Sequence, residues 1–467
     1  MKLIKMISRQ KTGLILGPLL FLIILFYDAE GMSWEAKSIA ASTAWIACWW
    51  LTEAIPIPAT SLLPIILFPL LGALEVGKVT AEYGNQIIFL LIGGFFIAIA
   101  MEKWKLHVRI ALLIVRTIGT SPRRTIAGFM AATAFISAWI SNTATAMMMV
   151  PIATAVIYQA SKAGEDKNFN TAIMLSVAYA ASIGGIATLI GTTPNLIFAG
   201  MYRTFYGTEI TFLQWASFGF PLAFLILVFC WAYLVYVAYP PEIKVLGKGI
   251  KDEIDKLGKI TSQEKKVLAV FLLIAALWIT RALWGKYLPM VSDSSIAVFG
   301  ALLLFLIPVG KGESLLVWND AVKLPWNVVL LLGGGLAIAR GFTETGLEVF
   351  SAQQLLFLKG ISEIEIILSV ITLTIFLTEI TSNTATATII IPVTASLAAA
   401  LGMEPIGLMI AAAISSSLAF MLPVATPPNA IVFGTGYVTM PQMARAGLWM
   451  NLSCIAIITL FITFIQM

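Results

Sequence analysis

Two six-residue segments of this chain are identical, and each lies in a strongly apolar stretch. The sequence Ser-Asn-Thr-Ala-Thr-Ala occupies residues 141–146 and again residues 382–387, 241 positions later. A proline follows each segment at the same distance, at Pro151 and at Pro392. Asparagine and threonine side chains are costly inside a lipid bilayer unless they are hydrogen-bonded or bind a ligand. We therefore expect the rest of the chain to bring the two polar segments together inside a membrane.

The composition agrees with a membrane location. Hydrophobic residues make up 59% of the 467 residues, and charged residues only 11%. A soluble domain of this length cannot bury so much apolar surface. Long windows with almost no charge recur along the chain, which indicates an all-α polytopic membrane protein rather than a barrel of short alternating strands.

Eleven apolar segments are predicted to cross the membrane as helices. The basic N-terminus runs directly into the first of them without a small-residue cleavage site, so we expect a retained helix that begins in the cytoplasm. The predicted spans are 12–27, 38–52, 60–76, 86–101, 170–200, 213–238, 266–283, 294–309, 325–342, 404–437 and 446–466.

The regions 122–157 and 363–400 differ from these spans, because each holds two apolar arms around a Ser-Asn-Thr tip. An arm of roughly 15 residues covers only about 22 Å at the helical rise per residue. The hydrocarbon core of a bilayer is ~30 Å thick. Each region is therefore predicted to be a re-entrant hairpin whose tip is surrounded by protein or water.

The loop 240–266 separates the two halves and follows six predicted spans. Its excess of lysine over acidic residues places it in the cytoplasm, and the C-terminus then lies outside after eleven spans. The lysines are Lys244, Lys248, Lys251, Lys256, Lys259, Lys265 and Lys266.

The two halves form an inverted repeat. Gly93-Gly94 matches Gly334-Gly335 at the same 241-residue offset, and the Gly-Thr-Thr-Pro-Asn cluster at 191–195 matches Ala-Thr-Pro-Pro-Asn at 425–429. Basic residues flank the first hairpin and acidic residues flank the second, so the two hairpins enter from opposite sides. Inverted repeats with paired interrupted helices predict a secondary transporter with its site near the bilayer midplane.

The tips have a chemistry that suits an anion together with cations. Free amides at the start of each second arm, from Ala144 and from Ala385, favour a carboxylate. Pro194 and Pro427 interrupt their helices and free carbonyl oxygens, which suit a hard cation such as Na⁺. Two symmetric tips suggest a dicarboxylate. The tips contain no lysine or arginine, so co-bound cations are expected to balance its charge.

Other kinds of chemistry have little support in the sequence. Cys48, Cys230 and Cys454 lie in apolar helices without metal spacing, and His107 is the only histidine. An intramembrane enzyme would need a nucleophile and base or a metal site, and a channel would not need paired broken helices. Glu379 and Glu53 remain open: each is either a proton carrier or a structural acid paired with amides or with a base. The structural role is favoured for Glu379, because the first repeat has no acid at its position.

Twin Ser-Asn-Thr tips, the Gly-Gly stretches and the two Thr/Pro/Asn clusters resemble the divalent anion/sodium symporter family over nearly the whole chain. This resemblance implies a homodimer in which a scaffold domain holds an elevator-like transport domain, linked by amphipathic stretches at 102–120 and 343–361. The expected domain boundaries are 1–121 and 266–362 for the scaffold, 122–238 and 363–467 for the transport domain, and 239–265 for the cytoplasmic loop.

The resemblance also implies the site residues. A first sodium pocket would use Ser137, Ser141, Asn142 and Gly191, and a second would use Thr378, Thr381, Asn383 and Ala425. The substrate would meet Asn142, Thr143, Asn383, Thr384, Thr426 and Pro427. Ser137 and Thr378 each lie four residues before a tip serine, which supports both pockets independently of the family.

The expected function is sodium-coupled import of a C4 dicarboxylate, such as succinate, malate or fumarate, across a bacterial plasma membrane. A sodium-independent dicarboxylate exchanger and a citrate or sulfate carrier are the alternatives that the sequence leaves open.

Overall fold

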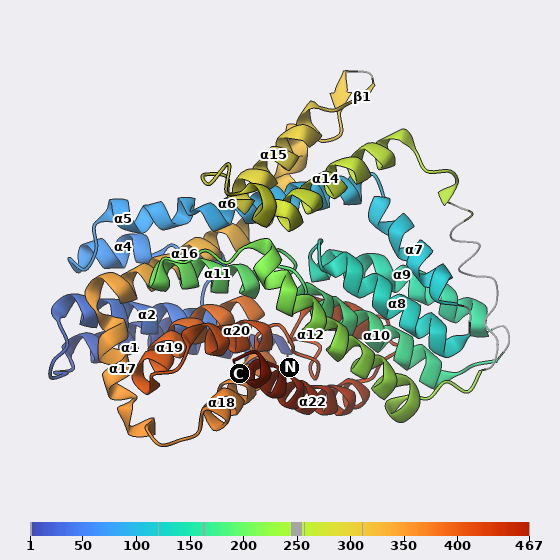
Figure 1. Cartoon of the computed structure of the whole chain (residues 1–467). Helices are drawn as coiled ribbons and strands as arrows, with labels where there is room; N and C mark the ends of the chain where they lie inside the picture. The colour runs from blue at the N-terminus through green and yellow to red at the C-terminus, as the bar shows by residue number, and fades with distance from the viewer. Residues whose placement is uncertain are drawn as a thin grey trace.

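The computed structural model describes residues 2–119, 121–161, 164–243, 255, 257–310 and 312–466. The described part is built from helices, apart from one short antiparallel pair, β1 (Pro308–Gly310) and β2 (Glu313–Ser314) (Figure 1). Four lysines of the predicted cytoplasmic loop, Lys244, Lys248, Lys251 and Lys256, lie outside the described residues.

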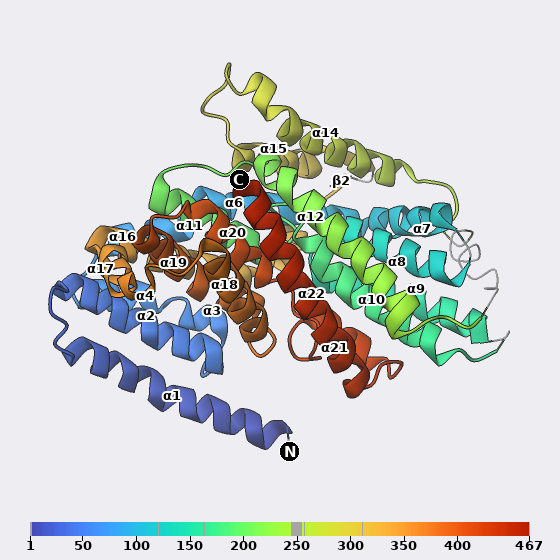
Figure 2. The ribbon, with the colours of Figure 1, turned by 60° about the horizontal axis from the view of Figure 1, so that its bottom comes forward.

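Helices from the first part of the chain form one layer. α6 packs against α15, while α2 and α4 pack against α16 from the second half. Figure 2 shows α1 along one edge of the molecule, beside α2. The elements are α1 (Lys2–Phe26), α2 (Trp34–Thr52), α3 (Ile57–Thr60), α4 (Leu63–Leu70), α5 (Val76–Ala81), the short helix η1 (Glu82–Gly84), α6 (Gln86–Lys103) and α7 (Leu106–Ile118).

The first hairpin and first broken helix follow. Pro122 begins the hairpin at the first helical turn, where a missing N–H costs nothing. A capping box between Thr211 and Gln214 begins the long helix after the break. The elements are α8 (Pro122–Ser137), α9 (Asn142–Ser161), α10 (Lys167–Gly185), α11 (Thr193–Tyr206), α12 (Phe212–Tyr233) and the π-helical turn η2 (Leu234–Ala238).

The second half repeats this order. Ser362 and Glu365 form the capping box that begins the second hairpin. The elements are α14 (Ser262–Trp284), α15 (Asp293–Leu306), η3 (Trp318–Lys323), α16 (Trp326–Thr345), α17 (Leu347–Gln354), η4 (Leu356–Leu358), α18 (Glu363–Thr378), α19 (Asn383–Leu401), α20 (Pro405–Ser415), α21 (Pro427–Gly434) and α22 (Met440–Gln466).

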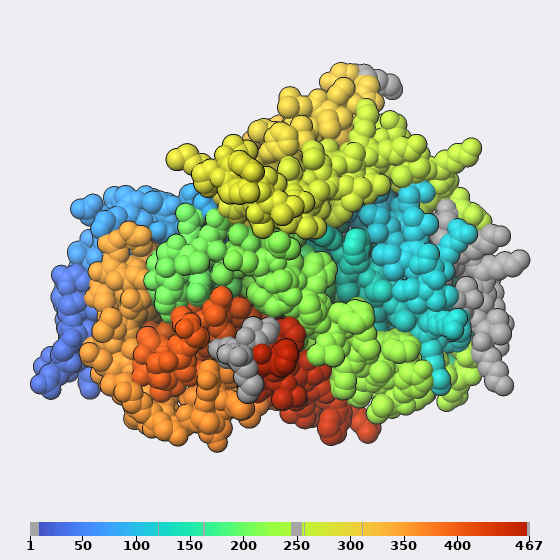
Figure 3. Space-filling view, in the orientation of Figure 1, coloured from blue at the N-terminus to red at the C-terminus, as the bar shows by residue number. Residues whose placement is uncertain are grey.

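The two repeats interleave. The second arm of each hairpin packs against the broken helix of the other repeat: α9 contacts α21, and α19 contacts α11. α10 also packs against α21, which joins the two breaks. Figure 3 shows the late segments of the chain lying between early segments on one face. This packing between the repeats brings the two tips to one place, although they are far apart in the sequence.

Eight helices in the described part of the chain are long and apolar enough to cross a membrane, judged by length and composition. The all-α polytopic fold with two hairpins and an inverted repeat is therefore confirmed, whereas the number of eleven spans stays a prediction. The eight stretches are Arg9–Phe26, Val76–Lys103, Asn142–Ser161, Phe212–Ala238, Ser262–Trp284, Trp326–Thr345, Asn383–Leu401 and Met440–Phe464.

Two local predictions were wrong. The segment 60–76 is not one helix, because α3 and α4 are separate pieces of 4 and 8 residues beside Pro58, Pro64 and Pro69. The second hairpin arms are longer than the predicted 15 residues: α9 has 20 residues and α19 has 19, because each helix continues through its proline. The first arms, α8 and α18, have 16 residues each.

Candidate functional site

Three oxygen atoms converge behind the first tip. The hydroxyl oxygen of Ser137 lies 2.7 Å from the side-chain oxygen Oδ1 of Asn142 and 2.7 Å from the carbonyl oxygen of Ala181. A serine hydroxyl has one proton, so it can donate to only one of these acceptors at a time. The cluster therefore has more oxygen lone pairs than donors, which is the environment that a small hard cation favours.

The second tip has the same arrangement. The hydroxyl of Thr378 lies 2.8 Å from Oδ1 of Asn383 and 2.7 Å from the carbonyl oxygen of Ser416. Both Ser137 and Thr378 are fully buried. A further hydroxyl pair is present only here, because Thr381 lies 2.6 Å from Thr386, oxygen to oxygen.

Each helix break is held by an asparagine that follows the break. Asn195 donates from Nδ2 to the carbonyl oxygens of Gly185 at 3.1 Å and Thr188 at 2.7 Å. Asn429 does the same in the second repeat, to Ala419 and Leu422, both at 3.1 Å. Both asparagines lie in the matched clusters of the sequence, but no role was predicted for them.

Each break also leaves an unsatisfied oxygen. Oδ1 of Asn195 and Oδ1 of Asn429 are buried, and neither has a hydrogen-bond partner among the described residues. A buried amide oxygen without a partner costs free energy, so these two atoms add to the excess of acceptors around the breaks.

The first pocket requires glycine in its wall. A Cβ atom at Gly185 would lie 2.7 Å from Oδ1 of Asn142, and a Cβ atom at Gly191 would lie 2.5 Å from the carbonyl oxygen of Gly185. Both approaches are too close for a side chain. The second repeat has Ala419 and Ala425 at the matching positions, so its wall is less tight.

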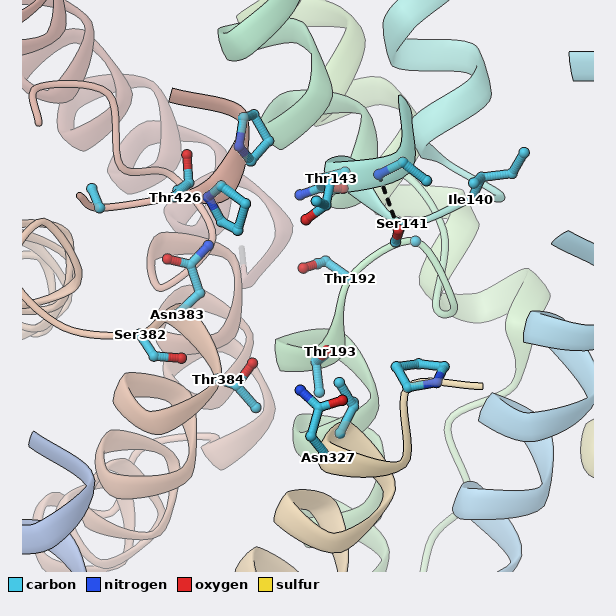
Figure 4. A pocket seen from close by; sticks show the side chains of 18 of the residues that line it. Ile140, Ser141, Thr143, Thr192, Thr193, Asn327, Ser382, Asn383, Thr384 and Thr426 are labelled. Atoms are coloured by element: carbon cyan, nitrogen blue, oxygen red, sulfur yellow. Dashed lines mark hydrogen bonds between the residues drawn. The ribbon is translucent and has the colours of Figure 1, made fainter. Parts of the chain in front are cut away.

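A cavity of about 770 Å³ lies between the two tips. Figure 4 shows Ser382, Asn383, Thr384 and Thr426 on one side and Ser141 and Thr143 on the other. All six residues predicted to meet substrate line this cavity: Asn142, Thr143, Asn383, Thr384, Thr426 and Pro427. Ser141, Gly191, Thr381 and Ala425 of the predicted sodium set line it too, whereas Ser137 and Thr378 lie behind the wall.

Several cavity residues were missed by the sequence analysis. Thr192 and Thr193 belong to the first break and could have been included from the motif alone. Asn327 comes from α16 and has no motif to mark it (Figure 4). The charged residues of the lining are Arg9, Glu53, Glu102 and Lys323. They lie in segments that are far apart in the sequence, so no local pattern brings them together.

The first helix reaches the second tip through Arg9. Its guanidinium donates to the carbonyl oxygen of Leu51 at the end of α2 and, at 3.4 Å, to that of Ile380 in the hairpin. Glu53 follows α2 in a left-handed backbone conformation with φ of 52°, which is uncommon for a residue with a side chain. Arg9, Glu53 and Thr52 thus form one corner of the cavity.

Glu379 accepts hydrogen bonds in the second break. Its carboxylate accepts from the backbone amides of Phe420, Met421 and Leu422 and from the side chain of Asn451. Arg340, a base that could have paired with Glu379, instead forms an ion pair with Glu344, at 2.5 Å from nitrogen to oxygen.

Comparisons with known proteins agree with this architecture. The model of the sodium:sulfate symporter transmembrane region matches residues 9–467. A protein named sodium-dependent dicarboxylate transporter SdcS from Staphylococcus saprophyticus is 46% identical over 473 residues, covering 98% of this chain and 91% of that protein. The protein of the same name from Staphylococcus aureus is also 46% identical, over 474 residues with the same coverage.

Two solved structures share the fold. The Alcanivorax borkumensis YdaH transporter superposes with a TM-score of 0.61 at 15% identity, covering 83% of this chain and 87% of its own. Neisseria gonorrhoeae MtrF, described as illuminating a class of antimetabolite efflux pumps, superposes with a TM-score of 0.55 at 13% identity, covering 82% and 83%.

Proposed function

Because this chain belongs to the divalent anion/sodium symporter family, we propose that it imports a C4 dicarboxylate together with sodium ions. The single observation that carries this proposal is the pair of oxygen clusters beside one cavity. Each cluster joins a hydroxyl, an asparagine Oδ1 and a backbone carbonyl oxygen, and each lies against a neutral tip. The SdcS relatives carry the same activity in their names.

The substrate would lie between the tips. Asn142 and Thr143 would donate to one carboxylate, and Asn383 and Thr384 to the other, with Thr426 and Pro427 shaping the wall. All six residues line the cavity. The hydroxyls of Ser137 and Thr378 contact the Oδ1 atoms of these asparagines, so the amide nitrogens would be the atoms that donate to the substrate.

Sodium would balance the substrate's charge. The first pocket would use Ser137, Ser141, Asn142 and Gly191, and the second would use Thr378, Thr381, Asn383 and Ala425. Among residues 140–144 and 380–384, which face the cavity from the tips, none is charged. Two carboxylates held by neutral donors alone would be poorly stabilised, so cation binding and substrate binding are expected to depend on each other.

The cavity would open to the cytoplasm. With the N-terminus inside, the start of α1, the end of α2, the end of α6 and η3 all lie on the cytoplasmic side. These four ends supply the charged residues of the lining: Arg9, Glu53, Glu102 and Lys323. The proposed state is therefore inward-facing, with the C-terminus of α22 outside.

Transport would follow an elevator mechanism in a homodimer. The proposed transport domain, 122–238 and 363–467, contains both hairpins and both broken helices, which pack on one another across the repeats. The proposed scaffold, 1–121 and 266–362, contains α6, α14, α15 and α16, and the loop 239–265 joins the halves. The short helices α7 and α17 would link scaffold to hairpins.

The test is uptake of labelled succinate by proteoliposomes with and without a sodium gradient. Uptake that requires external sodium supports the proposal, and undiminished uptake in sodium-free buffer contradicts it. Counterflow without sodium would instead indicate an exchanger. Competition by malate, fumarate, citrate and sulfate then identifies the preferred anion.

A further inference from the structure

Glu379 occupies an unusual position for an acid inside an apolar protein. Its side chain is buried, with 3% of its surface exposed. Oε1 accepts from the amides of Phe420 at 2.6 Å and Met421 at 2.9 Å and from Nδ2 of Asn451 at 2.8 Å, while Oε2 accepts from the amide of Leu422 at 3.1 Å. Within the described part of the chain, no lysine or arginine forms an ion pair with it.

Four hydrogen-bond donors surround the carboxylate and favour its ionised form. An ionised carboxylate has about four acceptor sites and no donor. Oε1 accepts three of the four bonds, so a proton would have to bind Oε2 and would weaken the bonds to Oε1. Hydrogen bonds from ionised groups of this kind are about twice as strong as neutral ones. The contacts therefore fit a carboxylate that stays ionised, rather than one that carries protons.

The same contacts hold the second sodium pocket together. Thr378 and Glu379 are neighbours at the end of α18, and they bind the beginning and the middle of the unwound segment between α20 and α21. Thr378 contacts the carbonyl of Ser416, and Glu379 binds the amides of 420–422. The carbonyl of Leu422 in turn accepts from Asn429. Moving Glu379 would therefore shift the carbonyl oxygens that surround the pocket.

In the first repeat, a contact between neutral groups joins the two matching positions. Ala138 corresponds to Glu379, and Thr188 corresponds to Leu422. There the hydroxyl of Thr188 donates to the carbonyl oxygen of Ala138 at 2.5 Å. The two breaks are thus held at the same two positions, by a neutral contact in one repeat and by a carboxylate in the other.

From these contacts we infer that Glu379 is a positioning residue for the second sodium pocket and that its charge makes this pocket the tighter of the two. The inference rests on the proposed sodium-coupled function. A buried negative charge next to a cation site strengthens cation binding more than an exposed one does, because water screens it less. The second pocket therefore fills at lower sodium concentration than the first.

Uptake assays on three variants test the role of Glu379. Glu379→Gln removes the charge and places an NH₂ group against the amide of Leu422, whereas Glu379→Asp keeps the charge on a shorter arm. Asp166→Asn is the matched control, because Asp166 also accepts backbone amides, those of Phe169, Glu242 and Ile243, at a distant loop.

We expect Glu379→Gln to raise the sodium concentration for half-maximal succinate uptake by ~10-fold, the effect of losing one charge-assisted contact. The succinate concentration for half-maximal uptake, measured at saturating sodium, should change by less than ~3-fold. The sodium concentration for half-maximal uptake by Glu379→Asp should lie between the values of the wild type and of Glu379→Gln. Asp166→Asn should keep the wild-type sodium dependence. A folded Glu379→Gln protein whose uptake has the wild-type sodium dependence overturns the inference. A variant whose uptake has lost its dependence on pH, with sodium dependence unchanged, also overturns it.

Hydrogen exchange of the wild-type protein tests the order of filling without any substitution. As sodium is added, the amides of 416–426 should become protected at lower sodium than those of 186–192. The reverse order, or equal protection, overturns the inference even if the Glu379 variants do not fold. Wild-type uptake that needs no sodium would instead contradict the proposed function itself. Failure of the inference and failure of the proposed function are therefore distinguishable.

Discussion

The two tips are identical in sequence, but the residues behind them differ. In both, a buried hydroxyl lies between an asparagine Oδ1 and a backbone carbonyl oxygen. The first repeat has Ala138 and Ile140 where the second has Glu379 and Thr381. The atoms that would touch ligands are thus kept equivalent, while the supporting contacts are free to diverge. Symmetry of the fold therefore does not impose the same surroundings on the two tips.

One consequence of this divergence is a difference in hydrogen-bond satisfaction. Thr386 shares a hydroxyl contact of 2.6 Å with Thr381. Its counterpart Thr145 has no partner among the described residues, because Ile140 offers no hydroxyl. The first tip therefore contains a buried polar atom that is unsatisfied in this state, and the second tip does not. Four substitution pairs test how far the two tips are equivalent.

The largest expected effect is loss of the tip asparagines. Asn142→Ala and Asn383→Ala should each reduce succinate uptake by roughly 100-fold, because each removes a donor to a carboxylate and an oxygen of a cation pocket at once. The measurement is initial uptake in proteoliposomes. Asn168→Ala is the control, since Asn168 bonds the carbonyl of Pro240 away from the tips.

Retained folding must be shown by size-exclusion chromatography and thermal melting. If only one asparagine proves necessary, the tips do not act as equal halves of one site. Full activity in both variants would remove the tips from the mechanism altogether.

A smaller effect is expected from a methyl group in the pocket wall. Gly185→Ala places a Cβ atom 2.7 Å from Oδ1 of Asn142 and should lower uptake by ~10-fold, because the asparagine must move. The mirror change Ala419→Gly removes a methyl group from the roomier second wall and should lower uptake by less than ~3-fold. Equal losses would show that the two walls are equally tight.

The next pair removes the buried hydroxyls. Ser137→Ala and Thr378→Val should each raise half-saturating sodium by about 5-fold, because one oxygen of several is lost from each pocket. Ser137→Thr and Thr378→Ser exchange the two hydroxyls between repeats and serve as controls. A shift in succinate half-saturation with no change in sodium dependence would place these hydroxyls in the substrate site instead.

The smallest expected effect is on stability and comes from the hydroxyl contact at the second tip, whose Thr381 also belongs to the proposed second sodium pocket. Ile140→Thr supplies Thr145 with the hydroxyl partner that Thr386 already has, and should change the free energy of unfolding by no more than about 1 kcal/mol. Thr381→Ile removes the hydroxyl partner of Thr386 and should lower the free energy of unfolding by about 1–2 kcal/mol. Thermal melting of both variants in detergent is the measurement. A stabilising Thr381→Ile would show that the hydroxyl pair contributes nothing.

Much of the site could be predicted from the sequence because its residues lie in repeated motifs. The tips and the hydroxyls at Ser137 and Thr378 repeat at an offset of 241 residues, and the clusters at the two breaks repeat at an offset of 234 residues. The parts of the site that could not be predicted depend on contacts between segments that are far apart in the sequence. Glu379 binds amides 41 to 43 residues away, and Arg9 reaches Ile380 across 371 residues. No local pattern encodes either contact.

The misread segments have local physical causes. The piece 60–76 contains apolar residues throughout, so periodicity alone could not separate α3 from α4, and its prolines decide where the helices end. In α9 and α19 the reverse holds, because Pro151 and Pro392 lie inside continuous helices. Neighbouring helices can satisfy the backbone group that such a proline frees.

The neutrality of the tips has an electrical consequence. Charges that belong to the protein move in both directions and cancel over a transport cycle, so the net charge moved is that of the cargo alone. Two sodium ions with one doubly charged dicarboxylate sum to zero, and the membrane potential would then do no work on the cycle. Each additional cation would gain about 2.3 kcal/mol per 100 mV. The current that accompanies each succinate therefore counts the cations that travel with it.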